Sequence, residues 1–203
     1  MNIKLFGVQF TLSYPFVALV TLLLVTDDKG IVICCLLASF CHEMGHIFAM
    51  KFFGTKVDKI GLSVFDINII DTGKAYRGIT AEIIITLSGV FVNIVLFLLC
   101  YIVYNSYNIY MLRYFATANL TLGIFNALPI DSLDGGNALE LILRRNFSDK
   151  TVYFATLAIS ILFVIPLGFL SFFILLNSPY NFTFLFATLY LIGVIIFKRK
   201  KDF

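Results

Sequence analysis

Residues Ser39 to Met50 read SFCHEMGHIFAM and place two histidines and a glutamate in a stretch that is otherwise largely apolar. The surrounding run, residues 31–53, is long enough to cross a bilayer, because about 20 apolar residues at a rise of 1.5 Å cover roughly 30 Å. An ionisable side chain at membrane depth costs about 2.5–3.5 kcal/mol, so its presence there indicates a function. The stretch therefore predicts a membrane-spanning helix that carries a chemical site.

The spacing of the two histidines indicates which chemistry. His42 and His46 are four residues apart, so both imidazoles leave the same face of a helix. Two neutral imidazoles with a carboxylate beside them, here Glu43, are typical of a zinc site and its bound water. The sequence contains no third histidine. Because catalytic zinc normally takes three protein ligands, the third is expected to be a carboxylate from another segment.

A candidate for that carboxylate lies in the segment 129–136, which reads PIDSLDGG and interrupts an apolar run. Irregular backbone at membrane depth is tolerated only where it is buried in protein or lines a polar cavity. Asp131 and Asp134 are both candidates. Asp134 is favoured because Gly135 and Gly136 let the backbone approach a site closely. The alternative interpretation of Asp134 is an N-cap of the following helix.

The composition is that of an integral membrane protein. Of the 203 residues, 60% are hydrophobic and only 13% are charged, whereas a soluble domain is about a quarter charged. The net charge of +3 is too small to indicate nucleic-acid binding. The four cysteines lie in apolar spans without a CxxC pair, so we interpret them as small buried hydrophobic residues.

We predict an all-α polytopic membrane protein that forms a single domain over residues 1–203. Its six transmembrane helices are expected at residues 10–26, 31–53, 79–104, 109–128, 151–176 and 182–197. Six spans put both termini on one side, and the basic tail predicts that this side is cytoplasmic. Thirteen of the fifteen Lys and Arg then fall on the cytoplasmic side, the exceptions being Lys29 and Arg113. His46 lies eight residues before Gly54, about 12 Å from the cytoplasmic end of its span.

The segment 57–73 differs from the spans around it. Apolar and polar residues alternate with the period of a strand, and the phase slips near residues 64 and 65. This pattern predicts a β-hairpin between the second and third spans. The hairpin is expected either to pack on the helices or to offer an edge strand to an extended substrate.

Three motifs follow one another along the chain. They are HEMGH at 42–46, SGVFVN at 88–93 and NALPIDSLDGG at 126–136. Together they resemble the site-2 protease family of intramembrane zinc metalloproteases, whose patterns are HExxH, a GxxxN-like motif in the next span and NxxPxxxLDGG. The short first span and the position of HExxH in the second are similar to the bacterial stage IV sporulation protein FB group. The resemblance covers about residues 31–146.

The resemblance implies one zinc ion per chain, bound by His42, His46 and Asp134, with Glu43 as the catalytic base. It supports Asn126 as a polar residue near the site that contacts substrate or an oxyanion. It also implies a membrane-associated β-hairpin and a location in a bacterial cell membrane, with the active site toward the cytoplasm. The expected partners are a membrane-tethered protein substrate, the lipid bilayer and regulatory membrane proteins.

The expected activity is proteolysis within or near a transmembrane segment, with pro-sigma factor processing in sporulation as one candidate role. No PDZ or CBS domain is recognisable in the sequence. The resemblance therefore does not imply that nucleotides regulate this chain, nor that its substrate is a sporulation protein. One alternative is a membrane transporter, although the sequence shows no internal repeat and only one cluster of buried ionisable groups. The other is a catalytically silent relative that binds client helices, which would not need Glu43.

Overall fold

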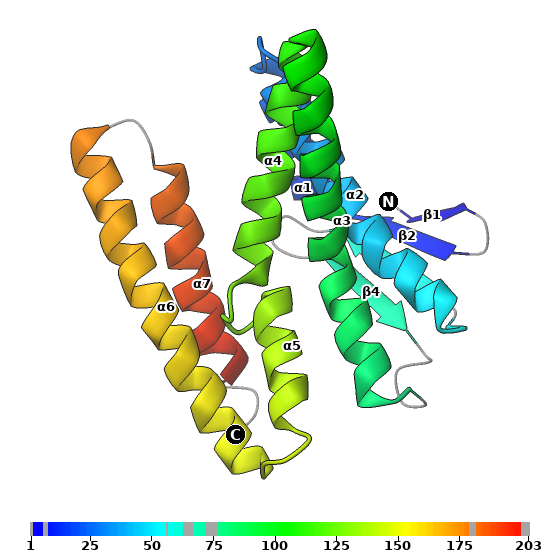
Figure 1. Cartoon of the computed structure of the whole chain (residues 1–203), viewed down its shortest axis with the longest axis vertical. Helices are drawn as coiled ribbons and strands as arrows, with labels where there is room; N and C mark the ends of the chain where they lie inside the picture. Colours follow the sequence, from blue (N-terminus) through cyan, green and yellow to red (C-terminus); the bar gives the residue numbers. More distant parts are fainter. Residues whose placement is uncertain are drawn as a thin grey trace. The chain divides into compact units, whose positions relative to one another are not determined.

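The computed structural model describes residues 2–5, 8–55, 57–62, 67–71, 77–178 and 182–199. The chain forms two compact units, Met1–Ile124 and Phe125–Phe203. Figure 1 shows that helices make up most of the chain. In chain order the elements are β1 (Asn2–Leu5), β2 (Val8–Leu12), α1 (Tyr14–Val25), α2 (Ile31–Phe52), β3 (Val57–Leu62), β4 (Ile67–Asp71), α3 (Ile79–Tyr107), α4 (Tyr110–Ala127), α5 (Asp134–Leu143), α6 (Asp149–Asn177) and α7 (Thr183–Arg199).

Helix α2 forms where the sequence predicts it, and both of its ends have a local cause. The carboxylate of Asp27 accepts hydrogen bonds of 2.9 Å from the backbone N–H groups of Ile31 and Val32. These are N–H groups that the first turn of a helix leaves without an internal partner. At the other end Gly54 has a φ of 74°, the left-handed conformation that commonly terminates helices.

Helices α2 and α3 pack closely in the first unit. A Cβ added at Gly45 would lie 2.9 Å from the carbonyl oxygen of Ser88 and 3.1 Å from the Cα of Gly89. Small residues at such a contact let two backbones approach, which is how helices associate in lipid. The HEMGH segment of α2 therefore lies directly against the SGVFVN segment of α3.

A four-stranded sheet with the order β1-β2-β3-β4 belongs to the same unit. Strand β1 is antiparallel to β2, β2 is parallel to β3, and β3 is antiparallel to β4. Strands β3 and β4 pair within the predicted hairpin segment 57–73, and the register shifts between Val57 and Lys59. Residues 63–66 and 72–73 of that segment lie outside the described residues.

The prediction of a first transmembrane helix over residues 10–26 is wrong at its start, and strands are not limited to the segment 57–73. Residues 8–12 form β2, and α1 begins only at Tyr14. The sequence V-Q-F-T-L alternates with the period of a strand, and β3 supplies the backbone partners that stabilise it. Because β3 lies some 50 residues further along the chain, local hydropathy did not reveal this pairing.

The second unit contains α5, α6 and α7, and Figure 1 shows α6 and α7 side by side. The hydrophobic core of this unit consists of Ile130, Leu133, Val164, Leu191 and Ile195. Two of these residues come from the segment between α4 and α5. The irregular segment that precedes Asp134 is therefore anchored in the core of its own unit.

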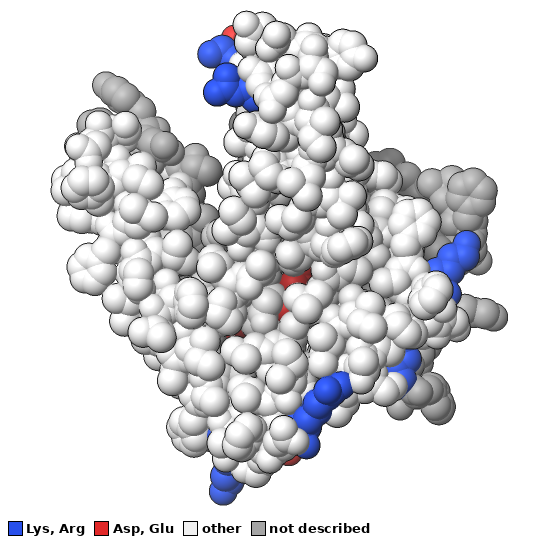
Figure 2. All heavy atoms as spheres, viewed as in Figure 1, with Lys and Arg blue, Asp and Glu red and all other residues white. Residues whose placement is uncertain are grey.

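Three helices are long and apolar enough to cross a membrane, namely Ile31–Phe52, Ile79–Tyr107 and Asp149–Asn177. Helix α7 contains a shorter apolar stretch, Phe184–Ile196. The face drawn in Figure 2 is mostly uncharged, with Lys and Arg at its margins. The chain is therefore a mainly helical protein with three candidate membrane spans among its described residues, and helix length and composition alone do not show the six predicted spans.

Candidate metal centre

The two histidines of α2 face each other, as their spacing predicts. His42 and His46 are buried, with 5% and 8% of their surface exposed. Their Nε2 atoms lie 3.2 Å apart, and the two rings meet edge to face. Glu43 is half-buried on the same helix.

His46 is oriented by the backbone of α3. Its Nδ1 lies 2.8 Å from the carbonyl oxygen of Ile85. A carbonyl can only accept a hydrogen bond, so Nδ1 carries the proton in the neutral ring and Nε2 presents a lone pair. The hydroxyl of Ser88 donates to the same carbonyl at 2.6 Å.

His42 is oriented by a side chain of α3. Its Nδ1 lies 2.5 Å from Oδ1 of Asn93, which has no exposed surface. An amide inside an apolar helix needs a hydrogen-bond partner within the protein, and this contact supplies one. Metal-binding histidines commonly donate their second ring nitrogen in this way, which fixes both the tautomer and the ring orientation.

This arrangement fits a zinc ion. Two nitrogens bound at 2.0–2.1 Å to a tetrahedral zinc are roughly 3.3 Å apart, close to the observed separation of 3.2 Å between the Nε2 atoms. Without a cation or a shared proton, two lone pairs at this distance repel each other. The donor set of this unit is therefore arranged for a positive ion between His42 and His46.

Gly89 leaves the space in front of the imidazoles open. A Cβ at this position would lie 2.5 Å from Nε2 of His46 and 2.8 Å from Nε2 of His42. Both contacts are shorter than van der Waals separation. A glycine is therefore required here by the two nitrogens that face the metal, and not by backbone conformation.

In the second unit Asp134 is the first residue of α5. The N-cap position belongs to Leu133, so the alternative interpretation of Asp134 as the N-cap is wrong. Asp131 donates its backbone N–H to Oγ of Ser160 at 2.9 Å. Asn126 is half-buried in the last turn of α4.

Gly135 and Gly136 serve a purpose that the sequence did not reveal. A Cβ at Gly135 would overlap the carbonyl groups of Ala127 and Leu128, and one at Gly136 would overlap that of Ile130. The first turn of α5 therefore packs directly on the backbone turn that precedes it. The two glycines thereby fix the position of Asp134 within this unit. This contact explains why glycines follow Asp134 in the LDGG sequence.

Sequence reasoning missed two other interactions in the first unit. Asn119 of α4 is fully buried and bonded to Asn93. Glu82, in the first turn of α3, forms an ion pair of 2.6 Å with Arg77, and both side chains are largely buried. Arg77 additionally donates to Oγ1 of Thr55, so this pair joins the end of α2 to the start of α3.

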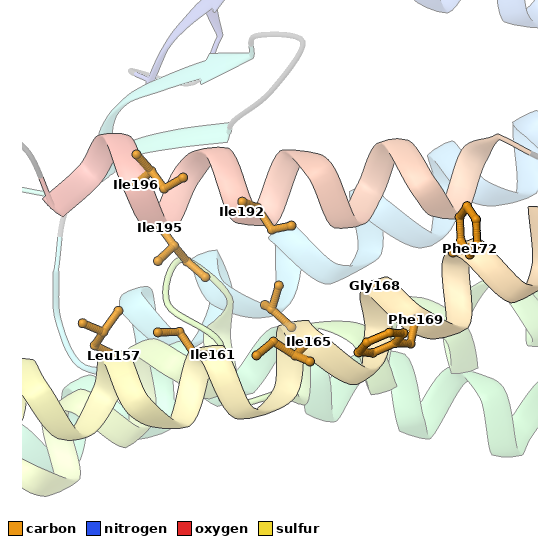
Figure 3. A pocket seen from close by; sticks show the side chains of 10 residues that line it. Leu157, Ile161, Ile165, Gly168, Phe169, Phe172, Ile192, Ile195 and Ile196 are labelled. Carbon is orange, nitrogen blue, oxygen red and sulfur yellow. The ribbon is translucent and has the colours of Figure 1, made fainter.

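A separate pocket of about 820 Å³ lies along α6 and α7 (Figure 3). Its lining consists of aliphatic and aromatic side chains and one glycine, including Leu157, Phe169 and Ile195. No ionisable group lines it. The pocket is therefore suited to an apolar chain and lacks the groups that hydrolysis requires.

Residues 104–167 match the family model described as peptidase family M50. The chain is 32% identical over 113 residues to the zinc metalloprotease MJ0392 of Methanocaldococcus jannaschii, a match that covers 52% of this chain and 32% of that protein. It is 25% identical over 158 residues to stage IV sporulation protein FB of Bacillus subtilis, covering 76% of this chain and 55% of that protein. The fold matches the site-2 protease from Methanocaldococcus jannaschii with a TM-score of 0.68.

The chain resembles the site-2 proteases of peptidase family M50. The resemblance predicted from the three motifs is thereby confirmed. The structural match covers 96% of this chain and 93% of the solved site-2 protease chain at 20% identity, so it establishes a shared fold. The chain spans about a third to just over half of the length of the two curated relatives.

We predict that Gly89→Ala weakens zinc binding by at least tenfold, because the added methyl occupies the space next to both Nε2 atoms. Chelator competition on the purified protein measures this affinity. Gly193→Ala is the matched control, since a Cβ there meets nothing within 4 Å. Equal zinc affinity in Gly89→Ala and the wild type would contradict the assignment of this space to the metal.

Proposed function

We propose that this chain is a zinc-dependent intramembrane endopeptidase that cleaves a membrane-tethered protein within or near its transmembrane segment. The observation that carries the proposal is the pair of buried imidazoles whose Nε2 atoms lie 3.2 Å apart beside Glu43. This pair lies in a helix long and apolar enough to span a membrane. The similarity to site-2 proteases supports the same activity.

We propose that Asp134 is the third protein ligand of one zinc ion, with His42 and His46 as the other two. Two imidazoles and one carboxylate are a donor set found in zinc peptidases, and they leave one position open for water. The order HExxH followed by LDGG supports this set. We favour Asp134 over Asp131 because it lies at the start of α5, where Gly135 and Gly136 fix its position.

A zinc ion held by His42, His46 and Asp134 would supply Lewis-acid polarisation of the scissile carbonyl and would lower the pKa of the attacking water. Glu43 is the general base that would accept a proton from the attacking water and deliver it to the leaving amine. The amide of Asn126 donates a hydrogen bond to the oxyanion, an interaction whose loss typically costs about 2.7–4 kcal/mol. The Nδ1 atoms of His42 and His46 face Oδ1 of Asn93 and the carbonyl of Ile85, which leaves their Nε2 atoms to bind the ion.

The proposal also includes the number of membrane spans and their orientation. The shorter helices α1, α4 and α7 complete six spans, with both termini in the cytoplasm and the site toward that side. The basic residues support this orientation. Strand β4 ends the order of the sheet, so it offers an edge to which an extended substrate adds. Strand addition would hold the unwound substrate, because a helical segment hides its scissile carbonyl in hydrogen bonds.

The two alternatives are less well supported. A transporter has no need of a catalytic carboxylate next to a zinc site. A silent client-binding relative would retain the fold but not the combination of Glu43 with two metal-facing imidazoles. A pro-sigma factor is one candidate for the client protein. Comparing client fragments in cells with and without this protein would identify the client.

We predict that Glu43→Gln lowers cleavage of a co-expressed single-span client by at least about 10²-fold, because the amide cannot accept the proton of the water. The zinc content of the purified variant is expected to equal that of the wild type. Client fragments on immunoblots and metal analysis measure the two quantities. Unchanged cleavage would remove Glu43 from the mechanism.

We predict that Asp134→Ala lowers the zinc content per chain, whereas Asp131→Ala retains it. Both substitutions remove one carboxylate from the same segment, so the comparison isolates the position of the ligand. Metal analysis after gel filtration in detergent provides the measurement. Retention of zinc in Asp134→Ala together with its loss in Asp131→Ala would transfer the ligand role to Asp131.

A further inference from the structure

The fully buried amide of Asn119 lies in the middle of α4, in a helix that is otherwise mostly apolar. An amide in such a place is costly unless its polar atoms are hydrogen-bonded. Its Nδ2 donates to the carbonyl oxygen of Phe115 at 2.9 Å. Its Oδ1 accepts a hydrogen bond of 2.9 Å from Nδ2 of Asn93.

These hydrogen bonds allow only one assignment of donors and acceptors. The carbonyl of Phe115 can only accept, so the donating end of the Asn119 amide faces it and the accepting end faces Asn93. Asn93 therefore turns its Nδ2 toward Asn119 and its Oδ1 toward His42. Oδ1 accepts from Nδ1 of His42, so the proton of this imidazole lies on Nδ1 and its Nε2 presents a lone pair.

We propose that Asn119 is a positioning residue for the metal centre: it fixes the amide orientation of Asn93 and thereby the Nδ1-protonated tautomer of His42. This inference rests on the proposed zinc site. It assigns a function to a residue on a third helix, two hydrogen bonds away from the imidazole. His46 needs no such chain, because its Nδ1 is bonded to a backbone carbonyl that cannot rotate.

Removal of the Asn119 side chain would break the row of hydrogen bonds that leads to His42. Nδ2 of Asn93 would keep only a 3.5 Å contact with the carbonyl of Ala38. The amide of Asn93 can then invert and offer Nδ2 to the ring of His42, which must accept it through Nδ1. The imidazole proton moves to Nε2, the atom that has to bind zinc. The fraction of protein competent to bind the metal falls, and the apparent affinity falls by the same factor.

The test uses ¹⁵N-histidine labelling of the full chain in detergent, stripped of metal. Because the sequence contains only two histidines, the spectrum reports the two rings of interest and no others. In the wild type both neutral rings are expected to keep a protonated Nδ1, bonded to Asn93 and to the carbonyl of Ile85, and the two unprotonated Nε2 atoms move apart once the metal is removed. In Asn119→Leu a population with protonated Nε2 is expected for His42 alone, while His46 serves as an internal reference.

Zinc affinity, measured by chelator competition, is expected to weaken by about tenfold in Asn119→Leu. Asn119→Asp should retain the wild-type tautomer and an affinity within about threefold, since its carboxyl group still accepts from Asn93. Thr117→Val is the matched control, because Thr117 is exposed on the same helix and its hydroxyl donates to a carbonyl four residues earlier. Asn119→Ala provides a second removal of the amide with less bulk if the leucine variant does not fold.

The proposal is overturned if folded Asn119→Leu or Asn119→Ala keeps the wild-type tautomer of His42. It is also overturned if both histidines change to the same extent, which would indicate general loosening of the helices. Failure of the proposed function has a different signature, namely a wild type that binds no zinc. The tautomer is measured without metal, so the two failures are distinguishable.

Discussion

The separation of 3.2 Å between the Nε2 atoms of His42 and His46 is the constraint on which the first unit depends. Two lone pairs at that distance are stable only when a cation binds both or a proton is shared. The protein favours the cation by bonding each Nδ1 to an acceptor, the carbonyl of Ile85 in one case and Oδ1 of Asn93 in the other. The energetic cost of this arrangement is offset when metal binds, so metal affinity and helix packing are coupled.

The close approach of α2 and α3 follows from that constraint. Both acceptors lie on α3, and they reach the imidazoles only because the two backbones pack at Gly45 and Gly89. A side chain at either glycine would separate the helices or fill the space of the metal. In the second unit, glycines again allow backbone contact, and the result is a fixed position for Asp134 at the start of α5. Small residues thus determine the local geometry of each unit.

The sequence predicted what depends on local pattern. The shared face of His42 and His46, the bounds of α2 and the irregular segment before Asp134 all follow from spacing, hydropathy and proline or glycine chemistry. The sequence did not predict β1 and β2, because β2 pairs with β3, a segment far along the chain, and β1 pairs in turn with β2. It did not predict the bonding of Asn119 either, since a single asparagine in an apolar helix does not indicate which neighbour it meets. The acceptor of His46 is a backbone carbonyl, and a backbone acceptor leaves no residue-type signal at all.

We propose that two imidazoles and a carboxylate hold one zinc ion, with none of the four cysteines involved. X-ray absorption at the zinc edge on the purified protein tests it most directly, because nitrogen and oxygen ligands at about 2.0–2.1 Å differ clearly from sulfur at about 2.3 Å. We expect one zinc per chain with two imidazole ligands, further oxygen ligands and no sulfur. A sulfur shell, or a first shell without two imidazoles, would contradict it.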